Sequence, residues 1–304
     1  MSFDKIVLHI GYHKTATSWL QKKFFENDEL PINALARYED RAKWLTEILK
    51  PDYTYCPEVL KGYINENYKY GSINVLSIER LSGYPITGGY DSYTLAHRLH
   101  DLIPDAKVII STREPKSMIK AAYIEYLKAN GAETLPELLK TKRNVFLRKP
   151  TFNLAFFKYQ HLINTYDKLF CSSNVLLLPI ELLQDKPSLY IELLASFMGI
   201  SLDTINNANL EVQEKVNSRF SMKDAYLNRL KSRLFGSDNN QIELIKSKTI
   251  ERLFDMIVPK LPLNYGQFLE NEIEAVINQI DESEFKQEQE YLQRRVAKQV
   301  AEAL

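Results

Sequence analysis

Four short apolar runs constrain the fold of this chain more than any other feature. They occupy residues 6–10, 75–78, 108–111 and 175–178, and each is rich in Val, Ile or Leu without clean polar alternation. Continuous apolar runs are typical of parallel strands that are covered on both faces. The longer segments between them carry apolar residues at helical spacing. This alternation predicts an α/β fold with a doubly wound parallel sheet flanked by helices.

From about residue 221 onward the pattern is helical only. We expect helices over 221–234 and 241–257 and two more within 267–304, with a break at 236–240 and a turn at 259–266. This pattern predicts an α/β domain over residues 1–220 and an all-helical C-terminal extension over residues 221–304, packed on or next to the core. The charge-rich end at 285–304 favours a packing helix, with homo-oligomerisation or a cover over the substrate cleft as alternatives.

The overall charge excludes some classes of partner. Lys and Arg together number 39, as do Asp and Glu, so the net charge is zero. We therefore expect no nucleic-acid partner, and any anion site must be local. Two cysteines without a Cys-x-x-Cys motif indicate neither a disulfide framework nor a zinc site. Because no run of 18 apolar residues and no leader-like segment occurs, we expect a cytoplasmic protein without an integral membrane segment.

The segment after the first apolar run predicts a phosphate-binding loop. Residues 11–19 read Gly-Tyr-His-Lys-Thr-Ala-Thr-Ser-Trp, a tight turn followed by a helix start. N–H groups at a helix N-terminus point at an anion, and the helix dipole favours negative charge there. Lys14 adds a cation, and Thr15, Thr17 and Ser18 add hydroxyl donors. The alternative is a plain strand–helix corner in which Ser18 caps the helix and Gln21 completes a capping box.

This loop departs from Gly-x-x-x-x-Gly-Lys-Ser/Thr. The order lysine, two small residues, Thr, Ser, Trp instead resembles the 5′-phosphosulfate loop of the sulfotransferases, with Ala16 in place of the usual glycine. That resemblance implies a P-loop-like fold, 3′-phosphoadenosine-5′-phosphosulfate (PAPS) as the donor and no required metal. The residues that it assigns to donor binding in this loop are His13, Lys14, Thr15, Ala16, Thr17, Ser18 and Trp19.

Arg113 begins a second expected anion site. It follows the third apolar run in Arg-x-Pro, which resembles the 3′-phosphate segment of the sulfotransferases. A helix start at Pro115 would offer further N–H donors. The family usually has a serine eight residues after the arginine, where this chain has Ala121, so Ser117 is the candidate replacement. The alternative for Arg113 is a structural ion pair with Glu114 or Glu79.

Glu79 is the candidate general base. A carboxylate at the end of a buried strand can accept a hydroxyl proton. Ser-x-Glu-x-Leu at residues 77–81 resembles the catalytic-glutamate segment of bacterial, heparan-type and tyrosylprotein-type sulfotransferases. The alternative is an ion pair with Arg80 or Arg113. The resemblance spans about residues 5–220, because residues 179–200 and 216–219 also resemble family segments, and it adds Arg219 as a late contact to the 3′-phosphate.

These features predict a sulfotransferase that moves a sulfuryl group from PAPS to a hydroxyl acceptor, with Lys14 and Glu79 as its catalytic residues. Bacterial relatives with a glutamate base often act on carbohydrates, so we favour a polysaccharide or glycolipid. Candidate acceptor contacts are Tyr84, Tyr90, Tyr93, Tyr123, Arg143, Arg148 and Lys149.

Two other functions remain open. One is an ATP-dependent kinase, against which the missing Gly-Lys-Ser/Thr counts. The other is a non-catalytic nucleotide-binding or assembly protein, which the departures at Ala16 and Ala121 would suit.

Overall fold

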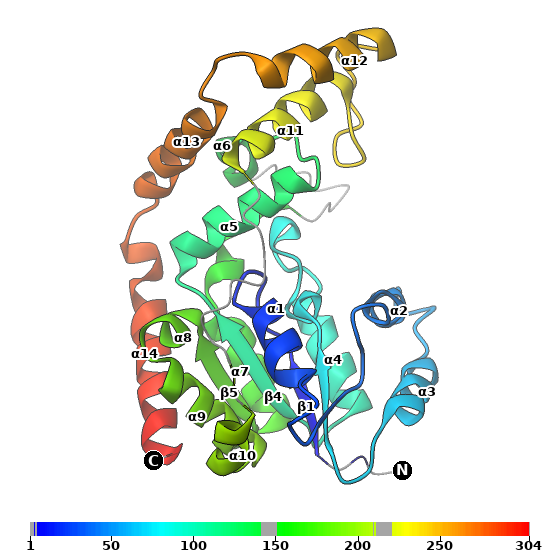
Figure 1. Ribbon diagram of the computed structural model, residues 1–304, viewed down its shortest axis with the longest axis vertical. Coiled ribbons are helices and arrows are strands. Elements are labelled where there is room, and N and C mark those ends of the chain that lie inside the picture. Colours follow the sequence, from blue (N-terminus) through cyan, green and yellow to red (C-terminus); the bar gives the residue numbers. More distant parts are fainter. Residues whose placement is uncertain (1–2, 4, 141–150, 209, 211–220, 304) are drawn as a thin grey trace.

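The computed structural model describes residues 3, 5–140, 151–208, 210 and 221–303, and in them five parallel strands form one sheet (Figure 1). The strands are β1 (Ile6–His9), β2 (Ile32–Ala34), β3 (Ile73–Ser77), β4 (Lys107–Thr112) and β5 (Val175–Pro179). Their spatial order is β2-β3-β1-β4-β5. The four predicted strands are confirmed. The edge strand β2 was not predicted, because its three half-buried residues, Ile-Asn-Ala, form no apolar run.

Both faces of the sheet are covered by helices, as the continuous apolar runs predict. Along β1, Ile6 and Leu8 enter one apolar cluster while Val7 enters the other. The first cluster holds residues of α3 (Pro57–Asn67), α4 (Ser92–Leu102), α5 (Pro115–Lys128) and α7 (Gln160–Phe170). The second holds residues of α1 (Thr17–Trp19), η1 (Leu20–Phe25), α9 (Pro187–Met198) and α10 (Leu202–Asn207). The shorter elements are α2 (Arg41–Ile48), η2 (Glu79–Ser82), η3 (Pro85–Thr87), α6 (Leu135–Leu139), η4 (Leu154–Phe157), η5 (Ser172–Asn174) and α8 (Ile180–Asp185).

The strand order favours a ligand site at the carboxyl end of β1. The chain leaves β1 toward β2 and β3 on one side and then crosses over to β4 on the other. In open α/β sheets, ligands bind outside the carboxyl ends of the strands at such a reversal. The segments that follow β1, β3 and β4 therefore meet at one edge, and these are the segments that carry Lys14, Glu79 and Arg113.

A buried histidine ties the ends of these three strands together. His9 Nδ1 lies 2.7 Å from Ser77 Oγ on β3, and His9 Nε2 lies 2.9 Å from Ser111 Oγ on β4. Burial, with a smaller contribution from the charge of Arg41, lowers the pKa of His9 to about 3. The imidazole is therefore neutral at pH 7. Next to it, Gly11 is needed for close approach, because a Cβ there would lie 2.8 Å from Ser111 Cβ and 2.9 Å from His9 Nε2.

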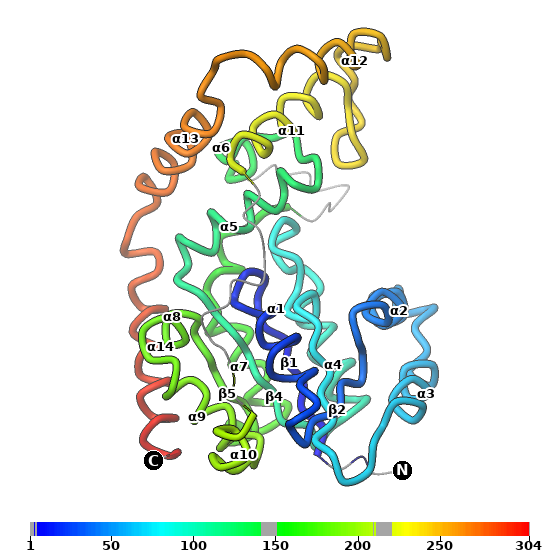
Figure 2. Tube along the Cα trace, viewed as in Figure 1, coloured from blue at the N-terminus to red at the C-terminus, as the bar shows by residue number. Residues whose placement is uncertain are grey.

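The C-terminal helices are α11 (Met222–Phe235), α12 (Lys248–Ile257), α13 (Tyr265–Gln279) and α14 (Ser283–Ala303), with the short η6 (Val258–Lys260) between α12 and α13. Helices α11 and α13 pack on α5, and α14 returns along α9 and β5 to the other end of the molecule (Figure 2). The helix predicted over 241–257 is wrong in its first part. It begins only at Lys248, where the Ser247 hydroxyl accepts from the Ile250 N–H at 3.4 Å, and residues 241–247 form a loop.

Candidate functional site

The loop after β1 turns several backbone N–H groups toward one side. Lys14 (φ 65°) and Ala16 (φ 59°) are left-handed, whereas Thr15 between them is not. Alternation of this kind forms a concave nest of N–H groups that suits an anion. Within the described part of the chain, the N–H groups of Lys14, Thr15 and Thr17 donate to no acceptor. The left-handed conformation also explains why glycine is the usual residue at position 16 of the loop that this one resembles.

The alternative of a plain capped corner is wrong. Helix α1 begins at Thr17 with Ala16 as its N-cap, and no side chain caps it. Gln21 is turned the other way, since its Nε2 donates to the Ser77 carbonyl and hydroxyl, both at 3.1 Å. A capping box built on Ser18 and Gln21 is therefore not formed. The Thr17 N–H donates to no acceptor among the described residues, whereas the N–H groups of Trp19 and Leu20 donate to the Ala16 carbonyl at 3.0 and 3.1 Å.

Three of the predicted loop residues, Thr15, Thr17 and Trp19, are engaged inside the protein. The Thr15 hydroxyl is fully buried and donates to the Tyr12 carbonyl at 2.6 Å, and Thr17 Oγ1 lies 3.4 Å from it. Trp19 is only 5% exposed and belongs to the apolar cluster beneath α9. Thr15 thus offers an incoming anion its backbone N–H rather than its hydroxyl, and Trp19 fixes the helix that follows.

Lys14 is held by a carboxylate that sequence reasoning missed. Its Nζ lies 2.9 Å from Glu125 Oε1 on α5, and the same oxygen also pairs with Lys128 at 2.8 Å. Burial raises the pKa of Glu125, but hydrogen bonds to Lys128 and Lys14 outweigh it and lower the pKa. The helical spacing places Ser117, Ala121 and Glu125 along one side of α5, at intervals of four, but it does not tell that this side faces Lys14.

His13 and Glu79 share a neighbourhood with Lys14. Burial lowers the pKa of His13, the charge of Glu79 raises it, and Arg80, Glu125 and Lys14 add smaller effects. His13 Nε2 is buried and has no hydrogen-bond partner among the described residues. A neutral imidazole with an unpartnered nitrogen beside a lysine and a glutamate marks the point where a ligand would complete the site.

The predicted alternative partner of Glu79 is occupied elsewhere. Glu79 opens η2 directly after β3, and Arg80 forms its ion pair with Asp91 at the start of α4. Glu79 forms no ion pair with any residue that the structure describes. Its half-buried carboxylate is therefore available as a proton acceptor.

Arg113 lines a pocket of about 390 Å³ on the first turns of α5. The wall contains Ser117 and Ala121, the two α5 positions that the sequence analysis singled out, together with two lysines and a carboxylate that it did not single out. The full lining is Arg113, Lys116, Ser117, Lys120, Ala121, Ile124, Glu274 and Ile277. The pocket thus carries three cations against one carboxylate, and Lys120 forms an ion pair with that carboxylate, Glu274. Within the described residues, the Ser117 hydroxyl makes no hydrogen bond, so it remains free to contact an anion there.

The N-terminus of α5 contributes less than expected. The Glu114 carboxylate accepts from the N–H groups of Lys116 at 2.9 Å and Ser117 at 2.6 Å, so the first-turn amides are already occupied. The guanidinium of Arg113 donates to the Lys14 carbonyl at 3.4 Å, and no ion pair with Glu79 or Glu114 is formed among the described residues. An anion in this pocket would therefore be held by side chains.

The candidate acceptor contacts differ in how exposed they are. Tyr90 and Tyr93, which are 65% and 66% exposed, line a pocket of about 300 Å³ at the same edge of the sheet. Tyr84 is half-buried beside His13, with ring centroids 6.1 Å apart. Tyr123 is fully buried, so its expected role in stacking on a substrate is wrong. The other acceptor candidates, Arg143, Arg148 and Lys149, lie outside the described residues, as does Arg219, the expected contact to the 3′-phosphate.

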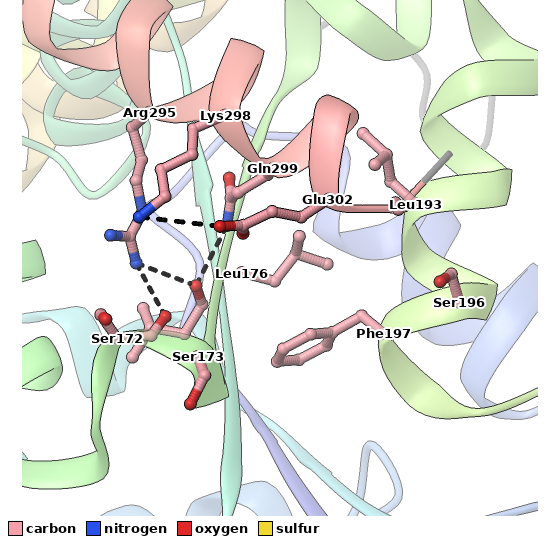
Figure 3. Close-up of a pocket in the computed structure, with 12 residues that line it drawn as sticks. Ser172, Ser173, Leu176, Leu193, Ser196, Phe197, Arg295, Lys298, Gln299 and Glu302 are labelled. Atoms are coloured by element: carbon pink, nitrogen blue, oxygen red, sulfur yellow. Dashed lines mark hydrogen bonds and ion pairs between the residues drawn. The ribbon is translucent and has the colours of Figure 1, made fainter.

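A separate pocket of about 310 Å³ lies between β5, α9 and α14 (Figure 3). Each of its charged side chains already forms an ion pair within the protein, although Arg295 Nε makes no hydrogen bond to a described residue. Arg295 donates to the carbonyls of Ser172 and Val175 and pairs with Asp167 at 2.9 Å, while Lys298 pairs with Glu302 at 3.6 Å. It also opens at the amino end of β5, away from the loop that carries Lys14, so we do not assign the active site to it.

Two properties bear on cofactors and location. Across the residues described here, no three His, Cys, Asp or Glu side chains lie close enough together to hold a metal ion. No helix in these same ranges has both the length and the apolar character needed to cross a membrane.

Comparison with known proteins shows which solved structures have a similar fold. No protein-family model and no curated protein sequence matches the chain. Among solved structures, a sulfotransferase from Alicyclobacillus acidocaldarius is similar over 94% of this chain and 100% of its own, with 15% identity and a TM-score of 0.50. The mouse sulfotransferase SULT7A1 complexed with PAP (13% identity, 89% and 90% coverage, TM-score 0.43) and the sulfotransferase domain of the curacin biosynthetic pathway (12%, 90% and 99%, 0.40) are also similar. The chain therefore has the sulfotransferase fold.

Proposed function

We propose that this protein transfers a sulfuryl group from PAPS to a hydroxyl group, and that the acceptor is a carbohydrate. One observation carries the proposal. Lys14 and Glu79, from the segments after β1 and β3, both lie close enough to the half-buried His13 imidazole to influence its pKa, and His13 Nε2 has no hydrogen-bond partner among the described residues. A cation, a proton acceptor and an unsatisfied donor or acceptor therefore surround one point at the strand ends, where this fold class binds ligands.

The residues present fit such a donor. The nest at residues 13–17 offers N–H groups to an anion, and the pocket of Arg113 and Ser117 offers a second anion site next to it. The hydrogen bond from Arg113 to the Lys14 carbonyl joins the two sites. Two adjoining anion sites suit a nucleotide with phosphate groups on both its 5′ and 3′ positions, and they distinguish it from ATP.

Each residue then has a definite task. When bound, PAPS would supply the sulfuryl group to the acceptor oxygen, with cleavage of the S–O bond to the 5′-phosphate and 3′,5′-adenosine bisphosphate as the leaving group. Glu79 accepts the proton of the attacking hydroxyl at its carboxylate. Lys14 exchanges its contact with Glu125 for the anion in the loop and balances negative charge that develops there. Arg113 and Ser117 hold the second phosphate.

The acceptor proposal rests on the aromatic pocket. Tyr90 and Tyr93 present exposed rings beside a cavity at the same edge of the sheet as Glu79. Flat rings with a polar tip suit the faces of sugars. The glycan would enter across these rings and present one hydroxyl to Glu79.

The test is transfer of labelled sulfate from PAPS to a panel of glycans and simple alcohols. We expect Glu79→Gln to lower turnover by about 10²–10⁴-fold, the usual range for general-base catalysis, without weakening binding of 3′,5′-adenosine bisphosphate. The matched control is Glu66→Gln on the exposed side of α3, which should retain full turnover. Transfer by Glu79→Gln at the normal rate would remove its assigned role, and magnesium-dependent ATP hydrolysis without transfer would favour a kinase.

A further inference from the structure

The outermost helix of the molecule exposes an unusual amount of apolar surface. We call residues 242–263, which contain α12 and η6, the α12 tip, and it lies at the end farthest from the sheet (Figure 1). Helix α12 buries none of its residues. Eight large apolar side chains of the tip are between 41% and 69% exposed: Ile242, Leu244, Ile250, Leu253, Met256, Ile257, Leu261 and Leu263. Concentrated exposure of this kind marks an interaction surface.

The apolar face of α12 points away from the protein. Its inner side packs on α11, because the Phe254 ring lies 5.6 Å from that of Phe235, and Glu251 and Asp255 pair with Lys231 at 3.3 and 2.7 Å. At the helical angle of 100° per residue, Leu253 and Met256 project from the opposite side. The outward face is therefore free for a partner.

The charges of the tip are asymmetric. It carries four cations, Lys246, Lys248, Arg252 and Lys260, all exposed and none in an ion pair with a described residue. Of its three carboxylates, Glu251 and Asp255 pair with Lys231, and Glu243 forms no ion pair with a described residue. The tip is thus locally basic in a chain whose net charge is zero.

We infer that the α12 tip docks on the surface of an anionic lipid bilayer. An amphipathic helix with aliphatic residues on one face and flanking Lys and Arg lies in the membrane interface, where the apolar face enters the acyl boundary and the cations meet lipid headgroups. This inference is independent of the proposed catalytic function. If both hold, the membrane would bring a glycolipid acceptor close to the enzyme.

A second copy of the chain fits this face less well. Two tips that met through their outward faces would bring the Arg252 side chains of both copies together, because Arg252 neighbours Met256 at a spacing of four, while the nearby carboxylates Glu251 and Asp255 are taken by Lys231. The tip also contains no Trp or Tyr, and its single Phe packs on α11, so it lacks the aromatic anchors that dominate protein interfaces. Aliphatic chains with flanking cations match a lipid surface better.

The experiment is co-sedimentation of the full chain with two kinds of vesicle: phosphatidylcholine alone, and phosphatidylcholine containing about one-third phosphatidylserine. We expect salt-sensitive binding to the second kind. Because each basic residue near an anionic surface changes the partition coefficient about fivefold, Lys248→Glu with Arg252→Glu should weaken it by about 25-fold or more. Leu253→Ser with Met256→Ser should weaken it by about tenfold or more, since several methylene groups no longer insert.

The control variant changes the same charge elsewhere. Lys69→Glu with Lys286→Glu reverses two exposed cations away from the tip and should leave vesicle binding within about twofold of wild type. Thermal unfolding checks that each variant is folded. The inference is overturned if the chain does not bind the anionic vesicles. It is also overturned if the control charge variant loses vesicle binding as strongly as the tip charge variant does. A third contradicting result is a dimer in sedimentation velocity that Leu253→Ser dissociates, together with no binding of the protein to vesicles.

Discussion

Substitution of His9 by glutamine should flatten the pH dependence of stability. His9 is fully buried between Ser77 and Ser111, and its pKa is lowered to about 3, against about 6.5 in an unfolded chain. Below pH 6.5 the His9 imidazole is therefore protonated in the unfolded chain but stays neutral in the folded protein. Stability falls as the pH drops from about 6.5 toward 3, at up to about 1.4 kcal/mol per pH unit. Between pH 7.5 and pH 5.0 this one group should remove about 2 kcal/mol.

The assay is urea unfolding of wild type and His9→Gln at pH 7.5, 6.5 and 5.0. Glutamine keeps a hydrogen-bonding group between the two serines but cannot titrate. The variant should be less stable than wild type at pH 7.5, since one buried hydrogen bond to a serine is lost or strained. This difference in the free energy of unfolding, which we call the gap, should narrow by about 2 kcal/mol at pH 5.0. All other titrating groups cancel in the difference. A gap that stays constant across the three pH values would refute the neutral buried imidazole.

Three further substitutions test individual contacts. Ala16→Gly should raise the free energy of unfolding by about 0.5 kcal/mol in urea titrations, because release of about 1–2 kcal/mol of left-handed strain outweighs the added chain entropy; a loss above about 1 kcal/mol would contradict this. Burial raises the pKa of Glu288 to about 7, so its ionised form costs stability as the pH rises from about 4.5 through 7. Glu288→Gln should therefore stabilise the protein at pH 8, by up to about 3 kcal/mol, and hardly at pH 4.5, as measured by thermal unfolding. Glu125→Gln should tighten binding of 3′,5′-adenosine bisphosphate up to about fivefold in calorimetry, because Lys14 no longer has to leave a carboxylate; weaker binding would show that Glu125 positions Lys14 instead.

The sequence predicts the sheet well because buried parallel strands need continuous apolar residues. All four predicted strands form, and Gly199 closes α9 in a left-handed conformation, as its position after the helical pattern indicates. The edge strand β2 escapes prediction because an edge position places few demands on its side chains. The start of α12 was not predicted correctly, because residues 241–247 continue the apolar spacing of a helix, whereas the helix itself begins after the N-cap Ser247.

The parts of the candidate site that lie within one short sequence motif are predictable, whereas contacts between residues far apart in the sequence are not. The loop around Lys14 and the Arg113 segment reach one edge of the sheet, as four strand ends imply. The contact of Glu125 with Lys14 depends on how α5 lies across the loop, which no local pattern specifies. Glu114 is likewise next to Arg113 in the sequence, which suggests an ion pair. It is instead the N-cap of α5, and its carboxylate accepts from the N–H groups of Lys116 and Ser117.

The most direct test of the central claim is calorimetric titration of the protein with 3′,5′-adenosine bisphosphate, with ATP as the control. We predict micromolar binding of the bisphosphate, about −8 kcal/mol, and weak binding of ATP. Arg113→Ala should reduce affinity for the bisphosphate by about tenfold or more, because a charge-assisted contact to phosphate is lost. No binding of the bisphosphate, or a preference for ATP with magnesium, would contradict the proposed donor site.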